Sequence, residues 1–181
     1  MDPQATEKIT HIITAFETFA LGDIRKVQRN EMPIAAFILG VCFLDQVSGF
    51  IYHRNKRGQK GSTDRAKKFV DEYINQVASK PYDKDELIEL LRNKLVHNYS
   101  LSDRNIPKHR RYQLEYLNPR LHLYTQDDIV FINVDGFVSD LENAFQFYKK
   151  KLLTDEVLQK NAIEHYDQFG ILVHREVQME E

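Results

Sequence analysis

The segment Arg92-Asn93-Lys94-Leu95-Val96-His97-Asn98-Tyr99 combines a permanent cation with a group that transfers protons near neutral pH. An arginine guanidinium offers planar paired donors to phosphate oxygens, and an imidazole can serve as general acid or base. These chemistries suit cleavage of a phosphodiester. We therefore predict catalytic roles for His97 in proton transfer, for Arg92 in stabilising charge on the phosphate, and for Asn93 in orienting both.

The helix that must position these residues is predicted to begin at Asp83, because Asp83-Lys-Asp-Glu86 has the pattern of a capping box, and to run to about residue 99. An α-helical wheel gathers five apolar side chains on a core face, namely Leu87, Ile88, Leu91, Leu95 and Tyr99. Arg92 and His97 flank the opposite polar face, about 140° apart.

Each of these residues also has a structural interpretation. Arg92 could form an ion pair with Glu89 or Asp85, which lie within two helical turns. His97 could be an ordinary surface or interface histidine, and Tyr99 lies on the side of the wheel that packs into the core. These alternatives stay open at the level of sequence.

The motif resembles the R-x4-H signature, in its extended R-x4-H-x-Y form, of the HEPN superfamily of α-helical ribonucleases and toxin-like proteins. The resemblance covers roughly residues 5–153. It implies metal-independent cleavage of RNA by a homodimer. In some toxin-like relatives of toxin–antitoxin pairs a nucleotidyltransferase antitoxin modifies the equivalent tyrosine, which implies the same partner for Tyr99. Many HEPN domains dimerise or bind ligands without cutting RNA, so a non-catalytic module is the alternative.

A second segment, Arg104-Asn105-Ile-Pro107-Lys-His109, has the same R-x4-H spacing. Pro107 would interrupt a helix there, and no tyrosine follows at the matching offset. The first segment is therefore the better candidate, and the second provides an internal comparison.

RNA contacts are predicted for two basic segments, because clustered lysine and arginine side chains hold phosphate backbones. Both segments are expected to be loops. The residues are Arg54, Lys56, Arg57 and Lys60 in the first segment, and Arg104, Lys108, Arg110 and Arg111 in the second. The formal net charge of -2 argues against a general affinity for nucleic acid. Binding would depend on where the fold places these segments.

The residue types in the chain bear on its cofactors and its cellular compartment. It has no glycine-rich phosphate loop and no Cys/His pair at metal-ligand spacing, so we expect neither a metal nor a cofactor. The single Cys42 cannot form an internal disulfide, which favours the cytoplasm. The apolar run 34–44 is shorter than a bilayer requires, so it predicts a core helix, with Cys42 buried in it, rather than membrane insertion.

The predicted fold is mainly α, a single domain over residues 1–181 with a bundle of five to six helices and a small β-hairpin insert. The expected helices, from apolar residues spaced three and four apart, cover residues 5–19, 33–52, 64–77, 83–99, 137–153 and 154–169. Ser62 or Thr63 is predicted to cap the third of these helices, and Thr154 the sixth. Gly22 and Asp23 are expected to break or bend the chain after the first helix. The hairpin is placed at about 121–133, with strands at 121–124 and 129–132, and the C-terminal extension at about 154–181.

Overall fold

The computed structural model describes residues 2–52, 61–96 and 111–171. The helical elements in these ranges are α1 (Pro3–Ala15), the π-helix η1 (Phe16–Ala20), α2 (Leu21–Arg29), α3 (Pro33–Ile51), α4 (Ser62–Glu72), the short 3-10 helix η2 (Ile74–Gln76), α5 (Lys84–Ile88), the π-helix η3 (Glu89–Val96), the 3-10 helix η4 (Pro119–Leu121), α6 (Val134–Leu152) and α7 (Glu156–Phe169). The strands are β1 (Arg111–Glu115), β2 (Thr125–Gln126) and β3 (Ile129–Asn133). The prediction of a mainly helical fold with a small β insert is confirmed.

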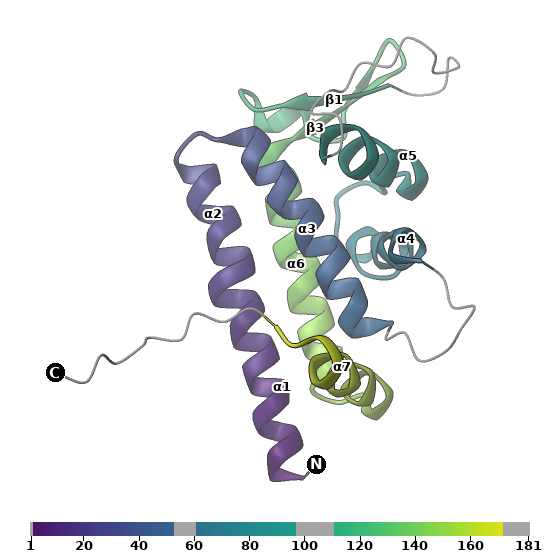
Figure 1. Cartoon of the computed structure of the whole chain (residues 1–181). Helices are drawn as coiled ribbons and strands as arrows, with labels where there is room; N and C mark the ends of the chain where they lie inside the picture. The colour runs from purple at the N-terminus through teal and green to yellow at the C-terminus, as the bar shows by residue number, and fades with distance from the viewer. Residues whose placement is uncertain (1, 53–60, 97–110, 172–181) are drawn as a thin grey trace, which may run out of the picture.

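The break or bend predicted at Gly22 and Asp23 is wrong, because both residues lie within helix α2. Instead α1, η1 and α2 form one continuous rod, seen on the left of Figure 1. Leu21 and Ile24 continue the buried face on both sides of the glycine. Because this face packs into the core, the chain stays helical and the backbone N–H and C=O groups keep their helical hydrogen bonds. The irregularity lies earlier, in the π-helical turn Phe16–Ala20, where Phe16 points into the core.

Helix α3 lies at the centre of the bundle and contacts α2, α4, α6, α7 and η3. Its buried side chains confirm the predicted core helix. By length and composition alone α3 is apolar enough to cross a membrane, with a mean hydropathy of 2.0, but buried core helices share that property and 61% of the apolar window is buried here. The burial predicted for Cys42 is wrong: its side chain is exposed, and partial desolvation together with the charge of Asp45 raises the pKa of its thiol.

Gly40 allows α6 to pack closely on α3. A Cβ at this position would lie 2.6 Å from Cε1 of Phe137 and 3.0 Å from Cδ1 of Leu141, and both of those side chains are fully buried. Overpacking of this kind typically costs about 1–3 kcal/mol. We expect Gly40→Ala to lower the free energy of unfolding in urea denaturation by that amount, less the roughly 0.5–1 kcal/mol that alanine gains over glycine within a helix. An unchanged denaturation midpoint would show that the two side chains can move aside.

The starts of α4 and α5 differ in how they are capped. The Asp83 side chain accepts hydrogen bonds from the backbone N–H of Asp85 and of Glu86, both at 3.0 Å, which confirms the predicted N-cap. The cap predicted at Ser62 or Thr63 is wrong, because Gly61 occupies the N-cap position and makes no side-chain bond. The two hydroxyls are used elsewhere, by Arg92.

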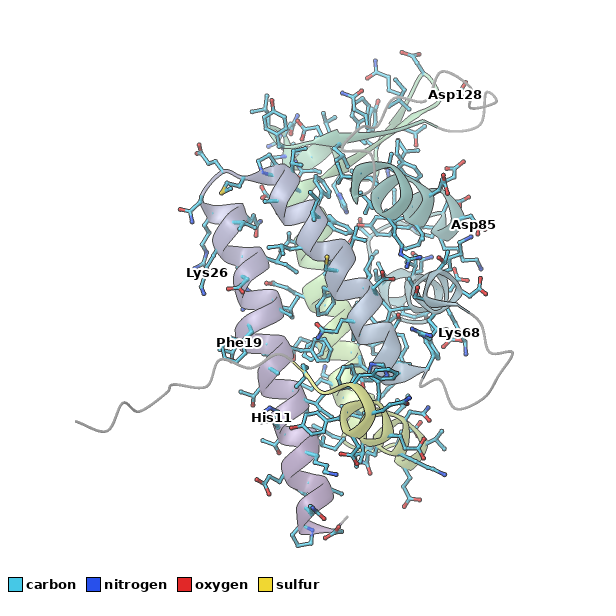
Figure 2. The ribbon with its side chains drawn as sticks, viewed as in Figure 1. His11, Phe19, Lys26, Lys68, Asp85 and Asp128 are labelled. Atoms are coloured by element: carbon cyan, nitrogen blue, oxygen red, sulfur yellow. The ribbon has the colours of Figure 1, made fainter. Side chains whose placement is uncertain are left out.

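The sheet has the strand order β1-β3-β2, with β1 parallel and β2 antiparallel to β3. The second strand of the predicted hairpin is confirmed, but the first is shifted to Thr125–Gln126, because residues 119–121 form η4 and Leu123 has a positive φ of 54°. Asp127 and Asp128 both have positive φ, as a tight hairpin turn requires. Figure 2 shows Asp128 at this tip. Strand β1 was not predicted, and it includes Arg111, which was expected in a loop.

Helices α6 and α7 follow the sheet. Asn133, the last residue of β3, caps α6 by accepting from the N–H of Asp135 and of Gly136. Asp155, rather than the predicted Thr154, caps α7. The Thr154 hydroxyl instead donates to carbonyl oxygens in the last turn of α6, which is why it is not available for the next helix.

Candidate functional site

The Arg92 side chain, carried by η3, is held by two other helices. Its Nε donates to Oδ2 of Asp45 on α3 at 2.9 Å, and its Nη2 donates to Oγ of Ser62 on α4 at 2.7 Å. Its Nη1 donates to Oγ1 of Thr63. Each of the three guanidinium nitrogens therefore has one contact, and these contacts connect η3 with α3 and α4.

The three contacts orient the Arg92 guanidinium but do not use all of its hydrogen-bond donors. Arginine carries five N–H donors, so three contacts leave two N–H groups that no bond to another described residue uses. The Arg92 side chain is 21% exposed. The Arg92 side chain is thus held in place by three contacts while part of it stays accessible to solvent.

The ion pair described for Arg92 is one that sequence reasoning did not propose. Asp85, one of the two predicted partners, pairs with Lys67 at 2.7 Å, and the described ion pair of Arg92 is with Asp45, 47 residues earlier. One signal was present: Asp45 is the single charged residue within α3, and a charge on an otherwise apolar core helix needs a partner. Nothing in the sequence marks Ser62 and Thr63 for this role.

The π-helical geometry of η3 changes the predicted wheel. A π-helix is bonded from residue i to residue i+5, so residues five apart lie on adjacent turns. Leu90 and Leu95 show this spacing, since both are buried although the α-helical wheel left Leu90 off the core face. The α-helical wheel therefore does not describe residues 89–96, and the predicted 140° separation of Arg92 and His97 ends on a residue outside the described part of the chain.

Several predicted residues lie outside the described ranges. Asn93 belongs to the backbone of η3, which ends at Val96. His97 and Tyr99 follow that end and are outside the described residues. The same holds for the basic residues Arg54, Lys56, Arg57, Lys60, Arg104, Lys108 and Arg110.

Both basic segments connect to described residues near the α5–η3 helix. Segment 54–60 leads into Gly61, and the next two residues, Ser62 and Thr63, contact Arg92. The second segment lies between η3, which carries Arg92, and β1, where the Tyr112 hydroxyl accepts from the N–H of Asp83 at the start of α5. The first segment is thus followed directly by residues that contact Arg92.

Lysines on the surface of α4 and α5 lie next to carboxylates on the same two helices, so their charges largely cancel. Lys67 pairs with Asp85, Lys84 with Asp71, and Lys68 lies 3.5 Å from Glu72. Figure 2 shows Lys68 and Asp85 on this side of the molecule. The hydrogen bond from Lys67 lowers the pKa of Asp85, against a smaller effect of burial. These lysines are thus less available to RNA than their number suggests.

A second polar cluster was not predicted. The Tyr82 hydroxyl donates to Oδ2 of Asp140 at 2.7 Å, and Nε2 of His122 lies 3.0 Å from the same oxygen. Burial, followed by the negative charge of Asp140 and the hydrogen bond to it, raises the pKa of Tyr82 well above its usual value. The three side chains come from the segment before α5, the end of η4, and α6. They join the segments next to α5 and η4 to α6, and they are too buried to receive a substrate.

Within the described residues, no group of three or more His, Cys, Asp or Glu side chains is placed to hold a metal ion. No family model, curated protein or solved structure matches this chain.

Proposed function

We propose that the protein is a metal-independent endoribonuclease of the HEPN type that acts as a homodimer. The observation that supports this most is the state of Arg92: its guanidinium is fixed by three contacts, partly exposed, and located beside the point where the basic segment 54–60 enters the fold. A preoriented cation of this kind is what stabilisation of a phosphorane-like transition state requires. The R-x4-H-x-Y motif supplies the reaction class.

In the proposed reaction His97 takes the proton of a ribose 2′-hydroxyl, and the oxygen attacks the adjacent phosphorus. The bond from phosphorus to the 5′-oxygen breaks, and a protonated histidine returns a proton to that oxygen. The products are a 2′,3′-cyclic phosphate and a 5′-hydroxyl. In a two-fold homodimer the second copy of His97 would supply the acid while the first acts as base. Arg92 donates to a non-bridging phosphate oxygen, and Asn93 orients the groups.

The direct test is incubation of the purified protein with a panel of RNAs in EDTA. We expect cleavage without metal, products that carry a cyclic phosphate by mass spectrometry, and no cleavage of the same sequences with 2′-O-methyl riboses, which lack the nucleophile. Size-exclusion chromatography with light scattering should show a dimer. Intact RNA across the panel, or cleavage of the 2′-O-methyl substrates, would contradict the proposal.

The contact with Asp45 favours a second candidate, a non-catalytic helical dimerisation or ligand-binding module. The Asp45 carboxylate partly neutralises Arg92, and the contact joins α3 to η3, as a purely structural arginine would do. In that case Arg92→Ala would lower stability in a thermal melt, and neither wild type nor variant would cut RNA. A monomer at micromolar concentration would also favour this candidate.

A further inference from the structure

We propose that Asp45, Ser62 and Thr63 are positioning residues for the cleavage reaction, in that they fix the plane of the Arg92 guanidinium before RNA binds. This inference rests on the proposed nuclease function and deepens it. The geometric basis is one contact to each guanidinium nitrogen: Nε to Asp45, Nη2 to Ser62 and Nη1 to Thr63. Three anchored nitrogens define a plane, so the guanidinium can neither rotate nor tilt without losing a bond.

The two hydroxyls lie where their usual task would be helix capping. Ser62 and Thr63 begin α4, yet the helix is capped by Gly61 without any side-chain bond. The hydroxyl oxygens instead accept from Arg92, 29 and 30 residues away in sequence. A hydroxyl oxygen accepts a hydrogen bond without carrying charge, so Ser62 and Thr63 hold the guanidinium without offsetting its charge.

Asp45 has a different effect from the hydroxyls because it carries charge. It accepts from Nε through Oδ2, while Oδ1 is buried and accepts no hydrogen bond from the other described residues. Its negative charge offsets part of the charge of Arg92 and so weakens the attraction of the site for a phosphate in the ground state. Asp45 thus balances orientation against affinity, whereas Ser62 and Thr63 affect orientation alone.

Thr63 provides the sharpest test, because Thr63→Val removes the acceptor with little change of shape and Thr63→Ser restores it. Misplacing a catalytic group by about 1 Å can cost up to 10²-fold, so we expect kcat for Thr63→Val to fall roughly 10- to 100-fold with KM changed little. Thr63→Ser should recover most of the loss. The matched control is Thr10→Val, because the Thr10 hydroxyl donates to the Thr6 carbonyl oxygen of its own helix and not to Arg92. Circular dichroism at the assay temperature confirms that each variant is folded.

Asp45→Asn tests the charge separately, since the amide oxygen can still accept from Nε. Removing the negative charge should lower KM several-fold at low salt and steepen the decline of binding with salt. If wild type cuts no RNA, the proposed function fails and the positioning role fails with it. If wild type cuts RNA but Thr63→Val and Thr63→Ser both match it, the positioning role alone is wrong.

Discussion

Replacing His97 with Ala is expected to lower the rate of RNA cleavage by roughly 10²- to 10⁴-fold, the usual contribution of a general acid or base. The variant should also lose the part of the pH–rate profile that reports the free base. Arg92→Ala removes charge stabilisation instead, and we expect a loss of roughly 10²- to 10³-fold without a change in the shape of the profile. Single-turnover assays with end-labelled RNA in EDTA measure both effects.

The chain contains its own control for this experiment. Arg104 and His109 repeat the spacing of Arg92 and His97, but Pro107 lies between them. His109→Ala should therefore cut RNA at the wild-type rate, apart from a modest change in KM if segment 104–111 contacts the substrate. If kcat falls as much in His109→Ala as in His97→Ala, the catalytic role assigned to the Arg92–His97 motif alone is wrong.

Gly136→Ala should be among the most destabilising single changes in the protein. A Cβ at Gly136 would lie 2.2 Å from Cγ of His122, so the imidazole must move away from Asp140. Overpacking costs about 1–3 kcal/mol, and the lost bond to a buried carboxylate about 1.5–3 kcal/mol, less about 1 kcal/mol gained in helix propensity. We expect the free energy of unfolding to fall by about 1.5–5 kcal/mol in urea denaturation.

Gly22→Ala is the matched control, because Gly22 is also helical but a Cβ there meets only the Glu17 carbonyl oxygen at an ordinary 3.7 Å. We expect that change to stabilise the protein by about 0.5–1 kcal/mol. Near-equal stabilities of the Gly136 and Gly22 variants would mean that the His122 ring adjusts without cost. The close packing of η4 on α6 would then be less rigid than the geometry indicates.

Elements set by local chemistry were predictable from sequence. Asp83 caps α5 because its side chain reaches N–H groups two and three residues away, and such short-range patterns are visible in the chain. The amphipathic stripe of α6 was predicted for the same reason. Asp155 took the cap expected of Thr154, which shows that two adjacent capping residues cannot be ranked from sequence alone.

Features set by distant contacts were not predictable. The partners of Arg92 are 29 to 47 residues away, and the parallel pairing of β1 with β3 depends on a connection through η4 and β2. The exposed position of Cys42 could not be inferred, because α3 is apolar on nearly all sides and its pattern does not show which stripe faces outward. The π-helical step of η3 leaves no trace in a wheel drawn for α-helices.

Asn133 has a mechanical consequence. The buried side chain of this residue caps α6 through its oxygen and donates through Nδ2 to Glu115 at the end of β1, while its backbone ends β3. One residue thus contacts β1, ends β3 and caps α6, and no loop separates β3 from α6. The sheet and the start of α6 are therefore tied together by a buried side chain as well as by the continuous backbone, and loss of that side chain would loosen both at once.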